Sequence, residues 1–179
     1  AIVQRSAQLL TGLDKQCSHT VREAYKKRGI QSYCGTQLRE VSGNAGKKQV
    51  TFTDHHGATH VLEADEILLA TGRRPATSGL ELEKAAIHLV RGKISIQKTM
   101  QTSQPHILAA GDVCSPLDVV HLAVQQGEIA ARNARKIMDG ETETLEEMDY
   151  RLRLFGVFSH PQVAAVGASE EELEKAGTP

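Results

Sequence analysis

The sequence predicts an α/β protein, and two observations lead to this fold class. Apolar residues recur at helical spacing in a stretch that ends near Lys27 and again over residues 115–138. Short apolar runs occupy residues 66–70 and 106–110, and each leads into a glycine loop. Such a run is typical of a central parallel strand, which is buried on both faces.

The elements expected in the first part of the chain are a strand, a helix and a group of paired strands. Ile2 and Val3 have the character of the end of a buried strand. The helix that follows is expected to stop at Arg28-Gly29, where a basic last turn meets a glycine. Residues 30–41 are one strand candidate. Residues 47–63 are expected to form a hairpin or meander, because alternating runs flank a turn at 54–57.

The second part of the chain is expected to be less regular. Residues 76–92 have an irregular or helical character, residues 93–97 alternate as a short strand, and residues 101–105 read as a loop. Gly140 is expected to stop the long helix. The acidic run over 141–149 is expected to be a linker.

Two strands are expected beyond this linker, 152–157 and 163–167, on either side of the turn Ser159-His160-Pro161. The chain opens in an apolar strand pattern and closes on a helix, whereas natural domains more often begin and end in polar, exposed segments. We therefore expect a piece of a larger protein. A preparation with trimmed ends is the alternative explanation.

Composition excludes several classes of function. The 179 residues provide about one domain's worth of chain, and a net charge of −1 gives no electrostatic reason to expect nucleic acid or an anionic membrane as partner. No apolar run approaches the ~18 residues of a membrane helix. The three cysteines are widely spaced, with no C-x-x-C and no metal-type cluster among them. We therefore expect no metal site. We also expect a cytoplasmic protein, because this cysteine usage fits a reducing compartment.

The strongest chemical signal is a pair of motifs at strand ends, ATG at 70–72 and AAGD at 109–112. Ligands of α/β sheets lie beyond the carboxyl ends of the strands, and glycine there lets the backbone approach a phosphate or sugar. The start of the long helix, near residues 118–122, carries partial positive charge that suits an anion. Each motif alone is weak, because A-x-G-D is common in plain loops. Together, and with TSQPHI before the second motif, they are specific.

The stretch that contains the second motif resembles a known family. T-S-x-P-x-I-x-A-x-G-D at 102–112 is similar to the second FAD-binding motif of the class I pyridine nucleotide-disulfide oxidoreductases. ATGRRP at 70–75 resembles the return from their NAD(P) domain to their FAD domain. Residues 155–172 resemble the opening strands of their interface domain. The resemblance covers nearly the whole chain in family order, and mercuric reductase and dihydrolipoamide dehydrogenase are the family members that the run from TSQPHI to VGASEEE resembles.

The resemblance implies incomplete Rossmann-like FAD- and NAD(P)-binding domains and the start of an α+β dimerisation domain. Residues 1–72 would finish the NAD(P)-binding domain, 73–148 would finish the FAD-binding domain, and 149–179 would begin the interface domain. The family implies hydride transfer from NAD(P)H to FAD and onward to a disulfide, a metal or a similar acceptor, in a homodimer. We expect no catalytic residue in these 179 residues and an inactive isolated chain.

The resemblance also assigns cofactor-binding residues. Asp112 would bind a ribityl hydroxyl of FAD, and Gly111 would let the backbone approach the cofactor closely. The helix start would face the flavin pyrimidine, where its dipole would stabilise negative charge on the reduced flavin. The full set implied for FAD is Ala110, Gly111, Asp112, Val120, His121, Leu122 and Ala123.

Two further residues bear on the pyridine nucleotide. Gly72 would lie near the join of the two cofactor sites. Arg5 follows the opening strand, where the family reads the adenosine ribose, and an arginine there favours the 2′-phosphate of NADPH over NADH. A solvated cation at a strand end is an equally good interpretation of Arg5 from the sequence alone.

Several features of the family are not found in this chain. It has no G-x-G-x-x-G, no C-x₄-C pair and no His-Pro-x-x-x-Glu dyad; Cys17 and Cys34 are 17 residues apart. His160-Pro161 is therefore expected to be a turn, and Cys114 a buried, inert thiol.

Two alternatives stay open. The chain could be a non-catalytic nucleotide-binding or interaction module, although such a module would leave open sheet edges. It could also belong to a flavin oxidase or reductase of the same fold without a redox disulfide. The electron acceptor is not identified by the sequence.

Overall fold

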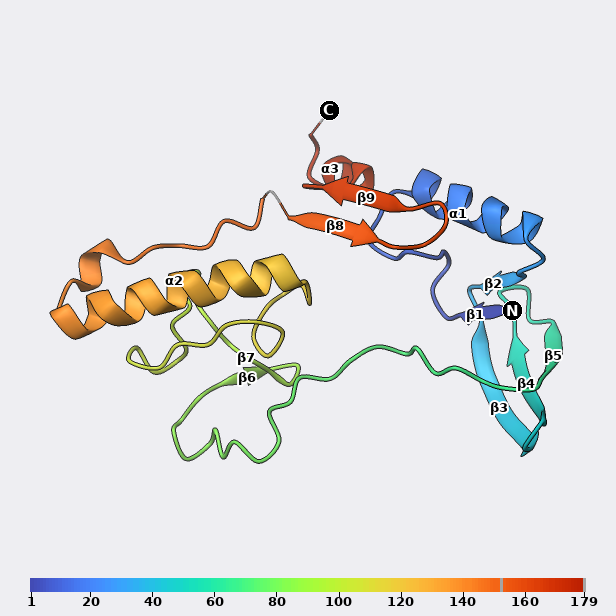
Figure 1. Cartoon of the computed structure of the whole chain (residues 1–179), viewed down its shortest axis with the longest axis horizontal. Coiled ribbons are helices and arrows are strands. Elements are labelled where there is room, and N and C mark those ends of the chain that lie inside the picture. Colours follow the sequence, from blue (N-terminus) through green and yellow to red (C-terminus); the bar gives the residue numbers. More distant parts are fainter. Residues whose placement is uncertain (152, 179) are drawn as a thin grey trace. The chain divides into compact units, whose positions relative to one another are not determined.

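The computed structural model describes residues 1–151 and 153–178 and confirms the α/β class (Figure 1). The chain forms two compact units. The first contains Ala1–Ala70 together with Leu154–Pro179, and the second contains Thr71–Arg153. The division into three family domains stays a prediction, and each unit is described by itself below.

The first unit begins with a β-α-β arrangement. Strand β1 (Ile2–Gln4) pairs in parallel with β2 (Ser32–Cys34), and helix α1 (Lys15–Lys27) lies between them in the chain. Val21 of α1 is 1% exposed, and Ala24 and Tyr25, at the same helical spacing, are half-buried. The predicted helix end is confirmed, because Arg28 caps α1 and Gly29 follows with a φ of 79°.

An antiparallel meander follows in the order β3 (Gln37–Asn44), β4 (Lys47–Thr53) and β5 (Thr59–Ala64). It confirms the predicted strand pair and the turn between its arms. The predicted single strand over 30–41 is in fact two strands, β2 and β3. They are separated at Gly35-Thr36, where the glycine has a φ of 68° that no regular strand accommodates.

The same unit contains a C-terminal hairpin and a short helix. Strands β8 (Leu154–Val157) and β9 (Val163–Val166) pair antiparallel, and His160-Pro161 lies in the turn between them, as expected. Helix α3 (Glu170–Lys175) starts with a capping box formed by Ser169 and Glu172. The first predicted residue of this region, Leu152, lies outside the described residues.

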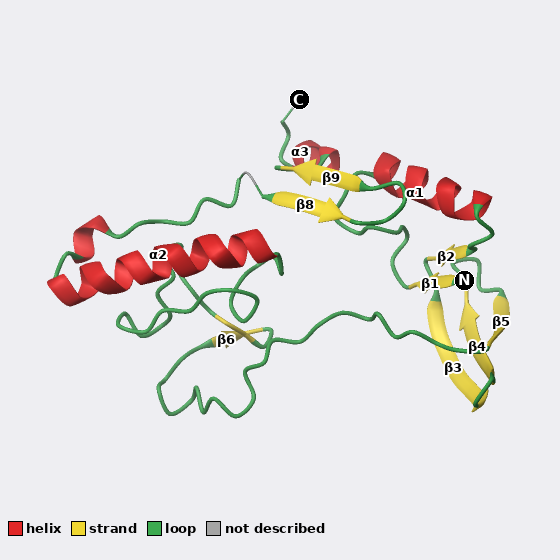
Figure 2. Cartoon of the chain, in the orientation of Figure 1, coloured by secondary structure: helices red, strands yellow, loops and turns green. Residues whose placement is uncertain are grey.

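The second unit is built around one long helix, α2 (Val120–Asp139), with strands β6 (Leu89–Val90) and β7 (Lys93–Ile94) and long loops (Figure 2). Gly140 ends α2 in the left-handed conformation, as predicted. The helix packs on an apolar core of Met100, Leu122, Ile129 and Met148. No helix in the described ranges combines the length and apolarity needed to cross a membrane.

The two apolar runs predicted as buried parallel strands are not strands. In residues 66–70 the side chains of Leu68 and Leu69 are 91% and 74% exposed. Residues 106–110 form only an isolated bridge between Leu108 and Gln101. A parallel strand needs a neighbouring strand for its backbone hydrogen bonds, and the described part of the chain places none beside 66–70.

Three other boundaries differ from expectation. The strand predicted over 93–97 contains only the two residues of β7. The long helix, predicted over 115–138, starts at Val120, because residues 115–119 form a hydrogen-bonded turn instead. The acidic run 141–149 is not a free linker. It contains the 3-10 helix η1 (Thr142–Thr144) and packs along α2.

Asn133 of α2 holds this acidic segment in place. The buried Asn133 amide donates to the carbonyl of Glu146 at 2.8 Å and accepts from the Glu146 backbone N–H at 2.8 Å. Arg132 also pairs with the Glu146 carboxylate, and Met148 beyond it is 3% exposed. Because the backbone of the acidic segment is hydrogen-bonded to α2, the segment is an ordered part of the second unit.

Candidate functional site

The AAGD loop of the second unit packs against the first turns of α2. Gly111 has a φ of 83°, and its backbone N–H donates to the side-chain oxygen of Gln126 at 2.8 Å. A Cβ atom at position 111 would lie 3.7 Å from the Cβ of Ala123. The structure therefore brings together Gly111 and Ala123, which the sequence assigned to one cofactor site.

Gln126 organises this loop and was missed by the sequence reasoning. Its side chain is fully buried, and its amide nitrogen donates to Ser115 Oγ at 3.1 Å and to the Tyr150 hydroxyl at 2.8 Å. The available signal was a polar residue between Leu122 and Ile129, at the helical spacing that faces the core. A buried amide with all its partners satisfied holds the surrounding backbone in one arrangement.

The start of α2 is open to an anionic group. The residue before the helix is Val119, which has no capping side chain, and the first turn contains no acidic residue. The first backbone N–H groups of a helix have no partner within the helix, and together they carry partial positive charge. This end of α2 can therefore accept a negatively charged atom of a ligand.

The four predicted residues at the helix start lie in different environments. Val120 is 80% exposed, Ala123 is half-buried, and Leu122 belongs to the apolar core. His121 Nε2 is shielded from solvent and has no hydrogen-bond partner within residues 1–151 and 153–178. A buried polar atom without a partner is costly, so it fits a position that a bound group completes.

The remaining predicted residues of this unit lie at its surface or near it. Asp112 is exposed and follows Gly111 directly, so its carboxylate is free to accept from ligand hydroxyls. Ala110 is half-buried. Gly72 is exposed, with a φ of 111°, and a Cβ atom at this position would have no neighbour within 4 Å. The structure does not place Gly72 in contact with the Gly111 loop.

Cys114 matches the expectation of a buried, inert thiol. It is 7% exposed, and burial raises the pKa of its thiol to about 11, although the charge of Lys93 opposes this shift. The thiol is therefore protonated at neutral pH, when it donates weakly to the Gly111 carbonyl at 3.4 Å. Cys114, Ser115 and Tyr150 also line one side of an open groove of about 690 Å³.

Arg5 lies in the first unit, directly after β1. Its side chain is exposed, and no ion-pair partner for its guanidinium is found among the residues the structure describes. An exposed, unpaired arginine at the end of a parallel strand is available to a phosphate.

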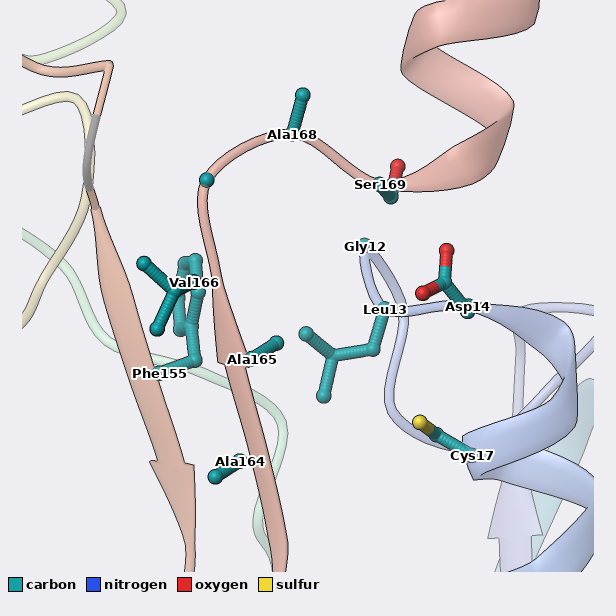
Figure 3. A pocket seen from close by; sticks show the side chains of 11 residues that line it. Gly12, Leu13, Asp14, Cys17, Phe155, Ala164, Ala165, Val166, Ala168 and Ser169 are labelled. Carbon is teal, nitrogen blue, oxygen red and sulfur yellow. The ribbon is translucent and has the colours of Figure 1, made fainter.

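A small cavity of about 140 Å³ lies between the start of α1 and the β8-β9 hairpin (Figure 3). Leu13 and Cys17 line it on one side and Ala165 on the other, and the Asp14 carboxylate accepts from the backbone N–H of Glu170 at 2.8 Å. Ligand pockets usually measure about 300–1,000 Å³. The cavity contains no predicted site residue and is too small for a nucleotide.

Comparison with known proteins decides the family. The sequence pattern of the pyridine nucleotide-disulphide oxidoreductases matches residues 1–127. The chain belongs to this family. The family uses FAD and NAD(P)H, and the match includes both strand-end motifs and Arg5.

Individual relatives agree with this assignment. The chain is 31% identical to mercuric reductase from Staphylococcus aureus, over 98% of its own length and 31% of that protein. It is 32% identical to dihydrolipoyl dehydrogenase from Mycobacterium leprae, over 98% of its own length and 37% of that protein. It is thus mercuric reductase- and dihydrolipoyl dehydrogenase-like, and spans about a third of the length of these relatives.

Solved structures of family members share the fold. The Cu(II) complex of the HOCl-induced flavoprotein disulfide reductase RclA from Escherichia coli superposes with a TM-score of 0.79 at 25% identity, covering 98% of this chain and 38% of that one. LpdA from Mycobacterium tuberculosis superposes with a TM-score of 0.76 at 28% identity, covering 97% and 36%. The described residues therefore correspond to part of the FAD/NAD-binding region of such proteins.

Proposed function

We propose that this chain forms part of an FAD-dependent NAD(P)H oxidoreductase. Residues 1–72 contribute the end of an NAD(P)-binding domain, 73–148 the end of an FAD-binding domain, and 149–179 the start of a dimerisation domain of a homodimer. The whole enzyme passes hydride from NAD(P)H to FAD and electrons onward to a disulfide, a metal or a similar acceptor. The isolated chain does not complete this reaction.

The observation that carries the proposal is the juxtaposition of the Gly111 loop with the uncapped start of α2. Gly111 lies against Ala123, and the helix N-terminus beside them lacks a capping side chain. A loop that allows close backbone approach and a positive helix end together suit a phosphorylated, electron-rich cofactor. The unpaired His121 Nε2 adds a polar atom that a bound group would satisfy.

The residues of this site have distinct proposed roles toward FAD. The Asp112 carboxylate accepts from a ribityl hydroxyl, and Gly111 with Ala110 leaves room for the ribityl chain. The first turn of α2, which contains Val120, His121, Leu122 and Ala123, places its backbone N–H groups toward the flavin pyrimidine. Bound FAD supplies the hydride-accepting chemistry, and these residues orient it.

For the pyridine nucleotide, we propose NADPH as the preferred reductant. Arg5 is exposed, unpaired within the described residues and positioned at a strand end. A guanidinium binds a phosphate monoester with two parallel hydrogen bonds, whereas the ribose hydroxyls of NADH favour a carboxylate. Gly72 is proposed to lie near the join of the two cofactor sites in the whole enzyme.

We further propose a cytoplasmic location. The three cysteines, Cys17, Cys34 and Cys114, are all free thiols. Free thiols in a chain of this size fit a reducing compartment.

Titration of the chain with FAD tests the flavin site. Asp112→Asn removes the carboxylate charge with little change of shape, and we expect a loss of FAD affinity of about tenfold or more, because a hydrogen bond to a charged group is strong. Flavin fluorescence measures the dissociation constant. The control is Asp139→Asn at the far end of α2, where the carboxylate pairs with Arg135 and lies away from the Gly111 loop.

Equal FAD affinity in the wild-type chain and Asp112→Asn would contradict the role of Asp112.

A further inference from the structure

The backbone on both sides of Arg5 is held by one dipeptide, Gly35-Thr36, at the end of β2. The carbonyl of Gln4 accepts from both the backbone N–H and the hydroxyl of Thr36, each at 3.1 Å. The carbonyl of Ser6 accepts from the backbone N–H of Gly35 at 2.7 Å. The Gln4–Arg5 peptide group and the Ser6–Ala7 peptide group, one on each side of Arg5, are therefore both held by partners that lie about thirty residues further along the chain.

The clamping dipeptide is itself rigidly placed. Thr36 is 5% exposed, so its hydroxyl is removed from competing water. Gly35 adopts a φ of 68°, and a Cβ atom there would lie 3.3 Å from the Cβ of His55. A side chain at position 35 would be strained by its backbone conformation and crowded by His55.

The loop that follows Arg5 is also ordered by its own contacts. Leu9 is 8% exposed and anchors the loop to the unit. The Gln8 side chain donates to the Leu13 carbonyl at 3.0 Å, and the Leu13 N–H donates to the Leu10 carbonyl at 3.1 Å. The backbone on which Arg5 stands is thus fixed, while its guanidinium is exposed and has no ion-pair partner in the described part of the chain.

We infer that Thr36, supported by Gly35, is a positioning residue that sets Arg5 for a 2′-phosphorylated adenosine ribose. This inference rests on the proposed preference for NADPH. Bidentate recognition of a phosphate depends on the orientation of the guanidinium. A backbone fixed before binding lowers the entropy lost when the ligand is bound.

The test compares adenosine 2′,5′-bisphosphate with adenosine 5′-monophosphate as ligands of the full 179-residue chain, by calorimetric titration. The ratio of the two dissociation constants measures discrimination for the 2′-phosphate. Thr36→Val keeps the shape and the backbone N–H but removes the hydroxyl, and we expect this ratio to fall about threefold to tenfold, the effect of one hydrogen bond. Thr36→Ser retains the hydroxyl and is expected to restore the ratio.

The matched control is Thr20→Val. Thr20 makes the same kind of bond, from its hydroxyl to the Gln16 carbonyl at 2.9 Å, but on the exposed surface of α1. We expect this variant to keep the wild-type ratio. A general loss of structure in Thr36→Val would weaken both ligands alike, whereas loss of positioning weakens only the bisphosphate.

The outcomes separate the inference from the proposal beneath it. If Arg5→Ala abolishes discrimination and Thr36→Val leaves it intact, Thr36 is not a positioning residue and the NADPH proposal stands. If the wild-type chain shows no preference for the bisphosphate, the NADPH proposal and the inference both fail. Equal weakening of both ligands by Thr36→Val would also overturn the inference.

Discussion

The two loops proposed to bind cofactor, the AAGD loop and the loop after β1 that contains Arg5, are held by opposite means. In the second unit, one buried side chain, Gln126, contacts Gly111, Ser115 and Tyr150 and so fixes the AAGD loop. In the first unit, the backbone N–H groups of Gly35 and Thr36 donate two of the three hydrogen bonds that this dipeptide makes to the backbone around Arg5. The difference shows that the hydrogen bonds made by the single Gln126 amide can be removed by one substitution, whereas those around Arg5 come mainly from backbone N–H groups, so Thr36→Val removes only one of them and the others change only with the backbone conformation.

Gln126→Leu is expected to have the largest effect of the substitutions that test this difference between the two loops. The change leaves Gly111 N–H, Ser115 Oγ and the Tyr150 hydroxyl without this partner inside the unit, and buried polar groups that lose their partner are costly. We expect the free energy of unfolding to fall by about 2–4 kcal/mol, measured by urea denaturation. Gln125→Leu, on the exposed face of the same helix, is the control and is expected to have little effect. Equal losses in both variants would show that the hydrogen bonds of Gln126 do not hold the loop.

Gly35→Ala is expected to have a smaller effect, because it changes conformation and leaves the hydrogen-bonding groups in place. Forcing an alanine to a φ of 68° costs about 1–2 kcal/mol. Contact with His55 adds to this cost. Gly57→Ala separates the two contributions, because Gly57 has a φ of 84° and an added Cβ there would have no neighbour within 4 Å. If urea denaturation gives the same loss for both alanines, the contact with His55 contributes nothing.

The mildest change concerns acid stability in the first unit. His60 Nε2 donates to the Asp54 carboxylate at 2.8 Å, and this bond, opposed by burial and aided by the backbone N–H groups of Ala58 and His56, lowers the pKa of Asp54 from 3.8 to about 2. Because the pKa is lower in the folded state, the stabilisation is fully present above pH 3.8 and is lost as the pH falls toward 2.

We therefore expect the gap in urea midpoint between wild type and Asp54→Asn to shrink as the pH falls through this range. Asp65→Asn, on the exposed end of the same meander, serves as the control. A gap that stays constant from neutral pH to pH 2 would show that Asp54 is not responsible.

Local patterns predicted the regular elements well. The end of α1 at Arg28-Gly29 and the turn of the meander follow from residues close together in the chain, whose preferences operate without tertiary help. The apolar run 66–70 was misread, because its strand character requires a neighbouring strand that the described residues do not provide. A buried strand is decided by its partners as much as by its own composition.

In the candidate site too, some contacts could be predicted from local sequence and others could not. The contact between Gly111 and Ala123 follows from a motif and the helix directly after it, and could be predicted. The role of Gln126 required knowing which face of α2 is buried. The clamp on Arg5 joins residues 4–6 to residues 35–36, and no local pattern reports a pairing over such a separation.

The missing cap at Val119 has a thermodynamic consequence. Replacing a good N-cap by an apolar residue typically costs a helix about 1 kcal/mol, so α2 begins at a disadvantage when nothing occupies its end. An anion bound there would supply the absent acceptor, and any ligand that binds only the folded state raises its stability with concentration. If the proposed cofactor binds at this helix end, the melting temperature of the chain rises with cofactor concentration, and removal of the cofactor exposes the unit to unfolding first at the start of α2.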